Sequence, residues 1–179
     1  MMSPPSDDLR AKLSQLATED TFLNAYARRR ARSATGSEWI GFCVAGETYA
    51  LPIGDLREIL KVPPITEVPR VPRFVLGVAP VRGMVVPILC MRRRLGFPPA
   101  PIGRSSRVLV CEVDGERYGL LVDAVSAVER LQEGQIERSP QLGGGAAAEF
   151  VAGIGRAGAR LIILLDARAV VTFSSREAR

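Results

Sequence analysis

The chain contains the same short pattern twice. Residues 46–53, Gly-Glu-Thr-Tyr-Ala-Leu-Pro-Ile, recur 69 positions later (46 to 115) as Gly-Glu-Arg-Tyr-Gly-Leu-Leu-Val. Farther on, residues 77–92 align without gaps on residues 153–168, an offset of 76 (77 to 153). The larger second offset requires an insertion, and the low-complexity run 142–148 lies in the right interval to be a flexible loop. Two similar halves are therefore expected to form two similar folding units.

Each half consists of short apolar runs separated by glycine and proline. Runs such as residues 85–89, 108–113 and 161–165 predict strands of small barrels or a sandwich. One stretch, residues 53–61, has apolar residues at helical spacing and predicts a short helix or turn. A half of roughly 70–80 residues is small for an independent core, so we expect two β-subdomains that share an apolar contact. A groove at that contact is a natural binding site.

The sequence changes character at residue 38. Residues 6–33 begin with the capping residue Ser6 and carry leucines at near-helical spacing, which predicts a helix. We therefore divide the chain into a helical N-terminal extension with its linker (1–37), a double β-domain (38–173) and a tail (174–179).

Several classes of enzyme are excluded by composition. The chain has no histidine and three cysteines without a C-x-x-C pair, so histidine-based nucleophile pairs and most zinc sites are ruled out. Asp123 and Asp166 each follow an apolar run, where a carboxylate more often caps a turn than performs catalysis. Tyr49 and Tyr118 occupy equivalent repeat positions and are interpreted as packing residues. We expect no enzymatic activity, no cofactor and no metal.

The charge pattern and the apolar runs of the chain indicate neither a nucleic-acid-binding segment nor a membrane-spanning one. The net charge of +5 is spread over extension, domain and tail, so no segment has the strong basic excess typical of nucleic-acid binding. The N-terminus has no secretory signal pattern and no apolar run is long enough to span a bilayer, so we expect a cytoplasmic location.

One segment is a candidate binding site. Arg82 and Gly83 lie at the turn between two apolar runs, and the second repeat has Gly158 where the first has Arg82. The shared fold therefore does not require the arginine. It is either a solvated hairpin tip or a contact to a carboxylate or carbonyl of a partner.

The order and spacing of several motifs resemble the CheW family of bacterial chemotaxis coupling proteins. The similarity covers residues 39–172 and includes Tyr49-Ala-Leu-Pro-Ile, Leu56-Arg-Glu-Ile, Gly77-Val-Ala-Pro-Val-Arg-Gly-Met-Val-Val-Pro-Ile, Gly119-Leu-Leu-Val-Asp-Ala-Val and Leu161-Ile-Ile-Leu-Leu-Asp. The sequence departs from the family at Pro80 and Val81, which replace Asn and Leu, and at Cys90, which replaces Asp.

The resemblance implies a mainly β fold of two interlocked five-stranded SH3-like barrels. It also implies a non-enzymatic scaffold of two-component signal transduction, which links the tip of a methyl-accepting chemoreceptor to the regulatory domain of a histidine kinase. Such a scaffold is peripheral to membrane arrays only through the receptors. By position, the implied receptor-binding residues are Leu56, Glu58, Ile59, Arg82 and Gly83.

Two alternatives remain open from the sequence. A small-barrel protein that binds nucleic acid needs aromatic and basic residues interleaved on one face, whereas only 6% of residues are aromatic. A detached kinase fragment would need a nucleotide-binding box or a phospho-accepting histidine, and the sequence contains neither. A protein–protein adaptor is the interpretation that the sequence favours.

Overall fold

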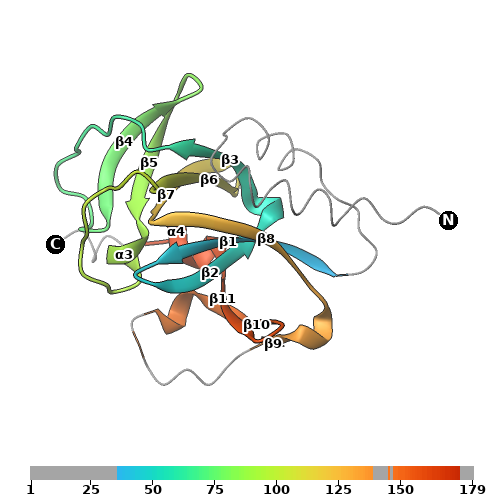
Figure 1. Ribbon diagram of the computed structural model, residues 1–179. Helices are drawn as coiled ribbons and strands as arrows, with labels where there is room; N and C mark the ends of the chain where they lie inside the picture. Colours follow the sequence, from blue (N-terminus) through green and yellow to red (C-terminus); the bar gives the residue numbers. More distant parts are fainter. Residues whose placement is uncertain (1–35, 139–144, 146, 174–179) are drawn as a thin grey trace.

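The computed structural model describes residues 36–138, 145 and 147–173. These residues form two β-sheets joined by short turns (Figure 1). The helix predicted over residues 6–33, most of the run 142–148 and the tail lie outside the described residues.

The two sequence repeats supply matching elements. The first repeat forms β1 (Ser37–Val44), β2 (Glu47–Pro52), the 3₁₀ helix η1 (Ile53–Asp55), β3 (Leu56–Lys61), β4 (Val75–Val81), β5 (Met84–Cys90) and α3 (Met91–Arg94). The second forms β6 (Arg107–Val113), β7 (Glu116–Val122), β8 (Ala124–Leu131), η2 (Glu133–Gln135), β9 (Ile136–Arg138), η3 (Ala148–Phe150), β10 (Val151–Ala157), β11 (Arg160–Leu165) and α4 (Ala167–Val171).

The strands form two barrels of similar construction. We call the five-stranded sheet, in the order β3-β6-β7-β5-β4, the first barrel. The six-stranded sheet, in the order β8-β1-β2-β11-β10-β9, is the second barrel. The expected pair of SH3-like barrels is confirmed, and the additional sixth strand is β9, which has three residues and lies at the edge of its sheet.

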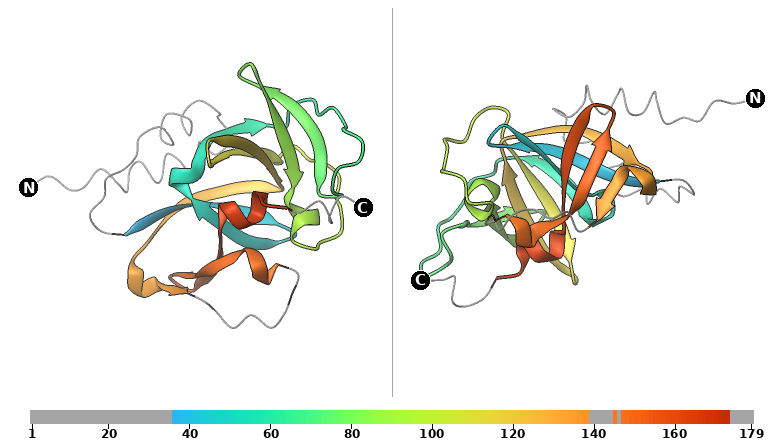
Figure 2. Two further views of the ribbon diagram at one scale, coloured as in Figure 1. Left: turned by 180° about the vertical axis from the view of Figure 1, so that it is seen from behind. Right: turned by 90° about the horizontal axis from the view of Figure 1, so that it is seen from below.

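The barrels do not coincide with the repeats, because the repeats exchange hairpins. The β1–β2 hairpin of the first repeat lies in the second barrel, and the β6–β7 hairpin of the second repeat lies in the first. Parallel pairing of β5 with β7 and of β11 with β2 joins the exchanged hairpins to their new neighbours (Figure 2). Since each repeat is small for a core of its own, the exchange allows one apolar cluster to run through both barrels, with members that include Phe42, Leu51, Leu56, Leu109 and Leu165.

The predicted helix or turn over residues 53–61 is only partly correct. Residues 53–55 form η1, but Leu56–Lys61 is strand β3, which pairs with β6. A bulge between Leu56 and Glu58 interrupts the alternation of the strand, so that Leu56 and Ile59 both point into the core. The bulge thus produces in a strand the three-residue spacing that resembles a helix.

The repeated Gly-Glu-x-Tyr pattern forms the same local structure in both copies. The Tyr49 hydroxyl donates to Glu47 at 2.6 Å, and the Tyr118 hydroxyl donates to Glu116 at 2.7 Å. Tyr49 is buried and Tyr118 is half-buried. Burial and the neighbouring carboxylate both raise the pKa of Tyr49 above its usual value. Both tyrosines therefore pack at the start of a hairpin's return strand, as expected from their repeat positions.

Arginines on α3 and α4 connect the two barrels. Arg92 on α3 makes a bidentate contact with Asp123, and the same carboxylate accepts a hydrogen bond of 2.8 Å from the Ala45 amide in the β1–β2 turn. At the matching position on α4, Arg168 pairs with Asp114 in the β6–β7 turn. Each helix therefore contacts, directly or through Asp123, the hairpin that its own repeat has placed in the other barrel.

Two side chains form hydrogen bonds with the backbone groups at the two ends of α4. Asp166 caps the N-terminus by accepting from the amides of Arg168 and Ala169, which confirms its expected turn-capping role. At the C-terminus, the buried Arg94 donates to the carbonyls of Val170 and Thr172 at 2.9 Å and 2.6 Å. Its guanidinium lies between the rings of Phe74 and Phe150, 4.2 Å and 4.4 Å from their centroids.

Candidate functional site

The β4–β5 hairpin projects from one end of the first barrel (Figure 1). Its turn places Arg82 and Gly83 in the left-handed region, at φ of 47° and 78°. The matching Gly158 has a φ of 63°, so the first residue of the turn is left-handed in both repeats. A side chain in this conformation costs about 1–2 kcal/mol, and the first repeat nevertheless carries an arginine there. Ala45 and Asp114 adopt the same left-handed conformation in other hairpin turns, so the case for Arg82 rests on its contacts and exposure.

Arg82 is held by a buried carboxylate. Its Nε donates to Glu58 Oε2 at 2.8 Å, while the Glu58 side chain is 5% exposed and that of Arg82 is 56% exposed. Glu58 lies on β3, and β3 and β4 are the outermost strands in the order of the first barrel. The ion pair therefore links the two edges of the sheet. Within the described part of the chain, the Arg82 Nη groups donate to no other residue and are available to a partner.

Three of the five receptor-binding residues implied by the resemblance are buried. Leu56 is 0% exposed and Ile59 is 1% exposed, and both pack in the cluster shared by the barrels. Glu58 is buried behind Arg82. Arg82 and Gly83 are the two that present surface. The structure brings Glu58 and Arg82 together beside Gly83, whereas Leu56 and Ile59 are core residues of β3.

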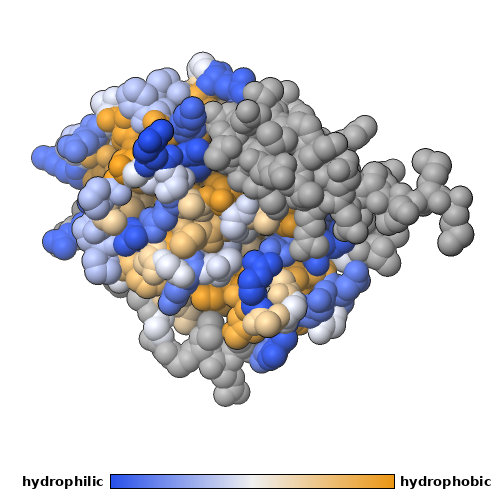
Figure 3. Space-filling model, viewed as in Figure 1, coloured by the Kyte–Doolittle hydropathy of each residue, from blue (hydrophilic) through white to orange (hydrophobic). Residues whose placement is uncertain are grey.

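Two exposed apolar residues adjoin the turn and were not singled out from the sequence. Met84 is 42% exposed and Val85 is 74% exposed at the start of β5. Residues 86 and 88 point into the first barrel, so the alternation of the strand places Val85 on the opposite face. The sequence does not reveal the exposure of Val85, because residues 85–89 form an unbroken apolar run. Such a run predicts a strand that is buried on both faces. We call Arg82, Gly83, Met84 and Val85 the hairpin surface, and Figure 3 shows hydrophilic and hydrophobic side chains adjacent at this tip.

Within the described residues, the cysteines and carboxylates do not form a reactive thiol site or a metal-binding cluster. The cysteines are free thiols, with Cys90 and Cys111 buried and Cys43 half-buried. Burial raises the pKa of the Cys111 thiol to about 12, which keeps it protonated at neutral pH. Among residues 36–138, 145 and 147–173, no three or more acidic, cysteine or histidine side chains are grouped so that they could hold a metal ion. In the same residues, no helix is long and apolar enough to cross a membrane.

Comparison with known proteins gives a consistent result. Residues 38–174 match the model of the CheW-like domain family. The chain is 32% identical over 141 residues to the probable chemotaxis protein CheW of Rhizobium etli, which covers 79% of this chain and 91% of that protein. It is 33% identical over 143 residues to the chemotaxis protein CheW of Rhizobium meliloti, covering 80% and 92% of the two chains.

A solved structure shows the same fold. The crystal structure of the scaffolding protein TtCheW from Thermoanaerobacter tengcongensis superposes with a TM-score of 0.73 at 30% sequence identity, and the match covers 79% of this chain and 97% of that chain. Sequence, family model and architecture thus agree. The chain belongs to the CheW-like family of chemotaxis coupling proteins.

Proposed function

We propose that this protein is a scaffold that couples chemoreceptors to the regulatory domain of a chemotaxis-type histidine kinase. The family match over residues 38–174, relatives named as chemotaxis proteins and a scaffolding protein of the same fold support this function. The protein acts by binding rather than by catalysis. It works in the cytoplasm and reaches membrane arrays through the receptors.

The hairpin surface is the receptor contact in this proposal, and the Arg82–Glu58 pair is the observation that carries it. A buried carboxylate holds the guanidinium by its Nε, and the remaining N–H groups point to a partner's carboxylate or carbonyl oxygens. Met84 and Val85 supply the adjoining apolar area. This combination suits a helical receptor tip, because apolar contact provides affinity and the charge sets the register.

Leu56, Ile59 and Glu58 act on the same contact indirectly, through the position of β3. Leu56 and Ile59 fix β3 in the core, and β3 in turn fixes the Glu58 carboxylate under the hairpin. Substitutions at the two apolar positions are thus expected to act on receptor binding through the placement of Glu58. Residues 38–173 contain the whole of this arrangement.

Nucleic-acid binding is the less supported function. Many arginines of the domain are paired with carboxylates, as shown by Arg57 and Arg117, which share Glu112 at 3.1 Å and 3.4 Å. A phosphate backbone would have to compete with these internal partners for the same guanidinium groups. Neither the family model nor the relatives reported above favour that alternative.

The proposal is tested by titrating a helical receptor-tip fragment against the full chain and single variants. Arg82→Ala is expected to weaken binding by roughly 1–3 kcal/mol, the usual cost of losing a charge-assisted contact. Val85→Ala should also weaken binding, and it leaves the Arg82–Glu58 pair intact. Arg168→Ala is the matched control, since Arg168 is 65% exposed and pairs with Asp114 away from the hairpin. Equal losses of affinity from Arg82→Ala and Arg168→Ala, measured at a temperature at which melting curves show both variants to be folded, would contradict this site.

A further inference from the structure

The small net charge of the β-domain conceals a strong division within it. Residues 59–111 carry nine basic residues and one acidic residue, a net charge of +8. The remainder of residues 38–173 carries seven basic and thirteen acidic residues, a net charge of −6. Charge is thus evenly spread between extension, domain and tail, but not within the domain. A division of this size produces a surface potential that attracts partners of the opposite charge.

The arginines of the two parts of the domain also differ in their partners. Outside residues 59–111, every arginine of the domain pairs with a carboxylate. Inside this segment, Arg82 and Arg92 pair with carboxylates, and the buried Arg94 binds carbonyl groups. The other six basic residues form no ion pair with any residue that the structure describes, and they are Lys61, Arg70, Arg73, Arg93, Arg104 and Arg107.

Two loops gather these six residues on one side of the first barrel. The first loop leads from β3 to β4, and the second leads from α3 to β6. At one end the loops meet because Lys61 lies opposite Arg107 in the register of β3 and β6. At the other end the Arg93 Nη1 donates to the Arg73 carbonyl at 2.8 Å. The loops therefore connect the same two places, and both views of the ribbon show them on the same side (Figures 1 and 2).

The backbone of the two loops is restrained. Seven of the 13 prolines of the chain lie in them, and each proline fixes one backbone torsion. The β3–β4 loop is also attached to β4, since Thr66 and Val78 exchange backbone hydrogen bonds of 2.8 Å and 2.9 Å. Gly77 permits this close approach, because a Cβ there would lie 2.1 Å from the Thr66 carbonyl oxygen. Restrained loops lose little conformational entropy when they bind a partner.

Arg107 is a buried cation without a carboxylate among the described residues. It is 7% exposed, and its Nη1 donates to the carbonyls of Arg104 and Ser106, both at 2.8 Å. Its Nε is buried and has no hydrogen-bond partner in the described part of the chain. Buried charges are normally paired, because their removal from water costs free energy. The charge of Arg107 therefore favours an anion from a partner near Lys61 and Arg104.

Each loop also exposes an aliphatic side chain close to an arginine. Val68 is 37% exposed and lies two residues before Arg70, and Ile102 is 53% exposed and lies two residues before Arg104. Both loops lie wholly within the described residues, and neither has an exposed aromatic side chain on which a nucleic-acid base could stack. Guanidinium groups beside aliphatic groups suit a polypeptide that carries both carboxylates and aliphatic side chains.

We propose that the two loops bind an acidic protein segment that carries aliphatic residues among its carboxylates. The guanidinium groups accept its carboxylates as hydrogen-bond partners, and Val68 and Ile102 contact its aliphatic side chains. This interaction is additional to receptor and kinase binding and does not depend on either. The exposed basic side chains of the loops form what we call the basic loop surface, namely Lys61, Arg70, Arg73, Arg93 and Arg104.

The experiment measures binding of the full chain to a fluorescent peptide of glutamate, leucine and serine by fluorescence anisotropy. The wild-type protein should bind this acidic peptide, more weakly as NaCl is added, and should not bind a peptide in which glutamine replaces glutamate. The triple variant Arg70→Ala/Arg73→Ala/Arg104→Ala should bind at least about tenfold more weakly, since an exposed charge pair contributes about two- to fivefold. These three side chains make no hydrogen bond to a described residue, so the variant should remain folded by circular dichroism.

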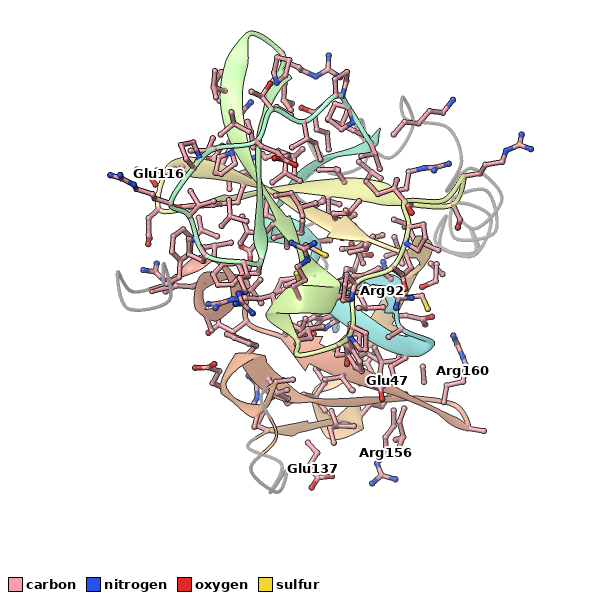
Figure 4. The ribbon with its side chains drawn as sticks, turned by 90° about the vertical axis from the view of Figure 1, so that its left-hand side faces the viewer. Glu47, Arg92, Glu116, Glu137, Arg156 and Arg160 are labelled. Atoms are coloured by element: carbon pink, nitrogen blue, oxygen red, sulfur yellow. The ribbon has the colours of Figure 1, made fainter. Side chains whose placement is uncertain are left out.

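The matched control is the triple variant Arg138→Ala/Arg156→Ala/Arg168→Ala. It removes the same charge from exposed arginines that pair with carboxylates away from the two loops. Figure 4 views the side on which the loops lie, with Arg92 of α3 near its centre and Arg156 on the second barrel below. Equal weakening in the two triple variants would show that net charge alone governs binding, and it would overturn the basic loop surface.

Further probes test the chemical class of the ligand. Ile102→Ser should weaken binding of the acidic peptide but not of a peptide in which serine replaces leucine, and no difference would overturn the aliphatic contact. Duplex DNA and vesicles that contain phosphatidylglycerol are the competing anions. Tighter binding of either one than of the peptide, lost in the loop variant, would overturn the assignment of a protein ligand. None of these probes contains a receptor or a kinase, so the proposed function is tested separately.

Discussion

Arg82 reaches across the end of the first barrel to Glu58, and this 2.8 Å contact ties the β4–β5 hairpin to β3. The carboxylate is buried and the guanidinium is more than half exposed. The loss of one partner therefore does not cost the same free energy of unfolding as the loss of the other. Removing the arginine leaves a buried charge, whereas neutralising the glutamate leaves an exposed cation in water. The pair consequently affects both stability and binding.

Arg82→Ala is expected to lower the free energy of unfolding by about 1–3 kcal/mol, because it leaves the Glu58 carboxylate buried without that partner. The double variant Glu58→Gln/Arg82→Ala should recover part of this loss, since the remaining amide is neutral. Urea unfolding of both single variants and the double variant gives the coupling energy directly. A double variant that loses the sum of the single effects would show that the two side chains do not interact.

Deletion of residues 1–36 is expected to leave a cooperatively folded domain. Within the described residues, the core clusters run from Ile40 to Val171 and include members from both barrels, so the domain that remains has an apolar core of its own. Thermal unfolding followed by circular dichroism is the measurement, with the full chain as the control. A product that aggregates, or that unfolds without a cooperative transition, would show that the extension is part of the folding unit.

Arg94→Ala is expected to lower the free energy of unfolding by about 3 kcal/mol, because the side chain satisfies carbonyls at the end of α4 and fills the space between two rings. Arg94→Lys keeps the charge but not the planar donor geometry, so it should recover only part of the loss. Denaturant unfolding of both variants is the test. Full recovery by lysine would mean that charge alone matters at this position.

Asp123 is expected to make stability depend on pH in the acid range. Burial acts to raise the pKa of Asp123, but the hydrogen bonds from Arg92 and the Ala45 amide outweigh it and hold the pKa below its usual value. A carboxyl whose pKa is lower when folded stabilises the protein above its unfolded pKa of about 3.9, and this contribution disappears as the pH falls further.

The measurement is the difference in unfolding free energy between the wild-type protein and Asp123→Asn across the acid range. The difference should be largest near neutral pH and should shrink below about pH 4. Asp114→Asn is a suitable control, because Asp114 forms the corresponding exposed pair with Arg168. A difference that stays constant with pH would contradict the assigned role of Asp123.

Local features of the fold were predictable from the sequence because they depend on neighbours in the chain. The repeat in residues 46–53 and 115–122 predicted matching hairpins, and Asp166 after an apolar run predicted a turn cap. The alignment placed Arg82 and Gly158 at matching positions, and both have left-handed backbone angles. The prediction of a helix or turn over residues 53–61 was only partly correct, because a single bulge in β3 changes the spacing of the core residues. Apolar periodicity alone does not reveal a bulge.

By itself the sequence determined the repeats, the mainly β class and the family, since turn residues, most strand patterns and the order of motifs depend on neighbours in the chain. Tertiary structure alone decided which hairpin enters which barrel, because that choice depends on burying one apolar cluster between segments far apart in sequence. It also decided that Glu58 meets Arg82 and Glu129 meets Arg160. Those pairs join residues 24 and 31 positions apart, and a buried carboxylate accepts whichever guanidinium the closed barrel brings within hydrogen-bonding distance.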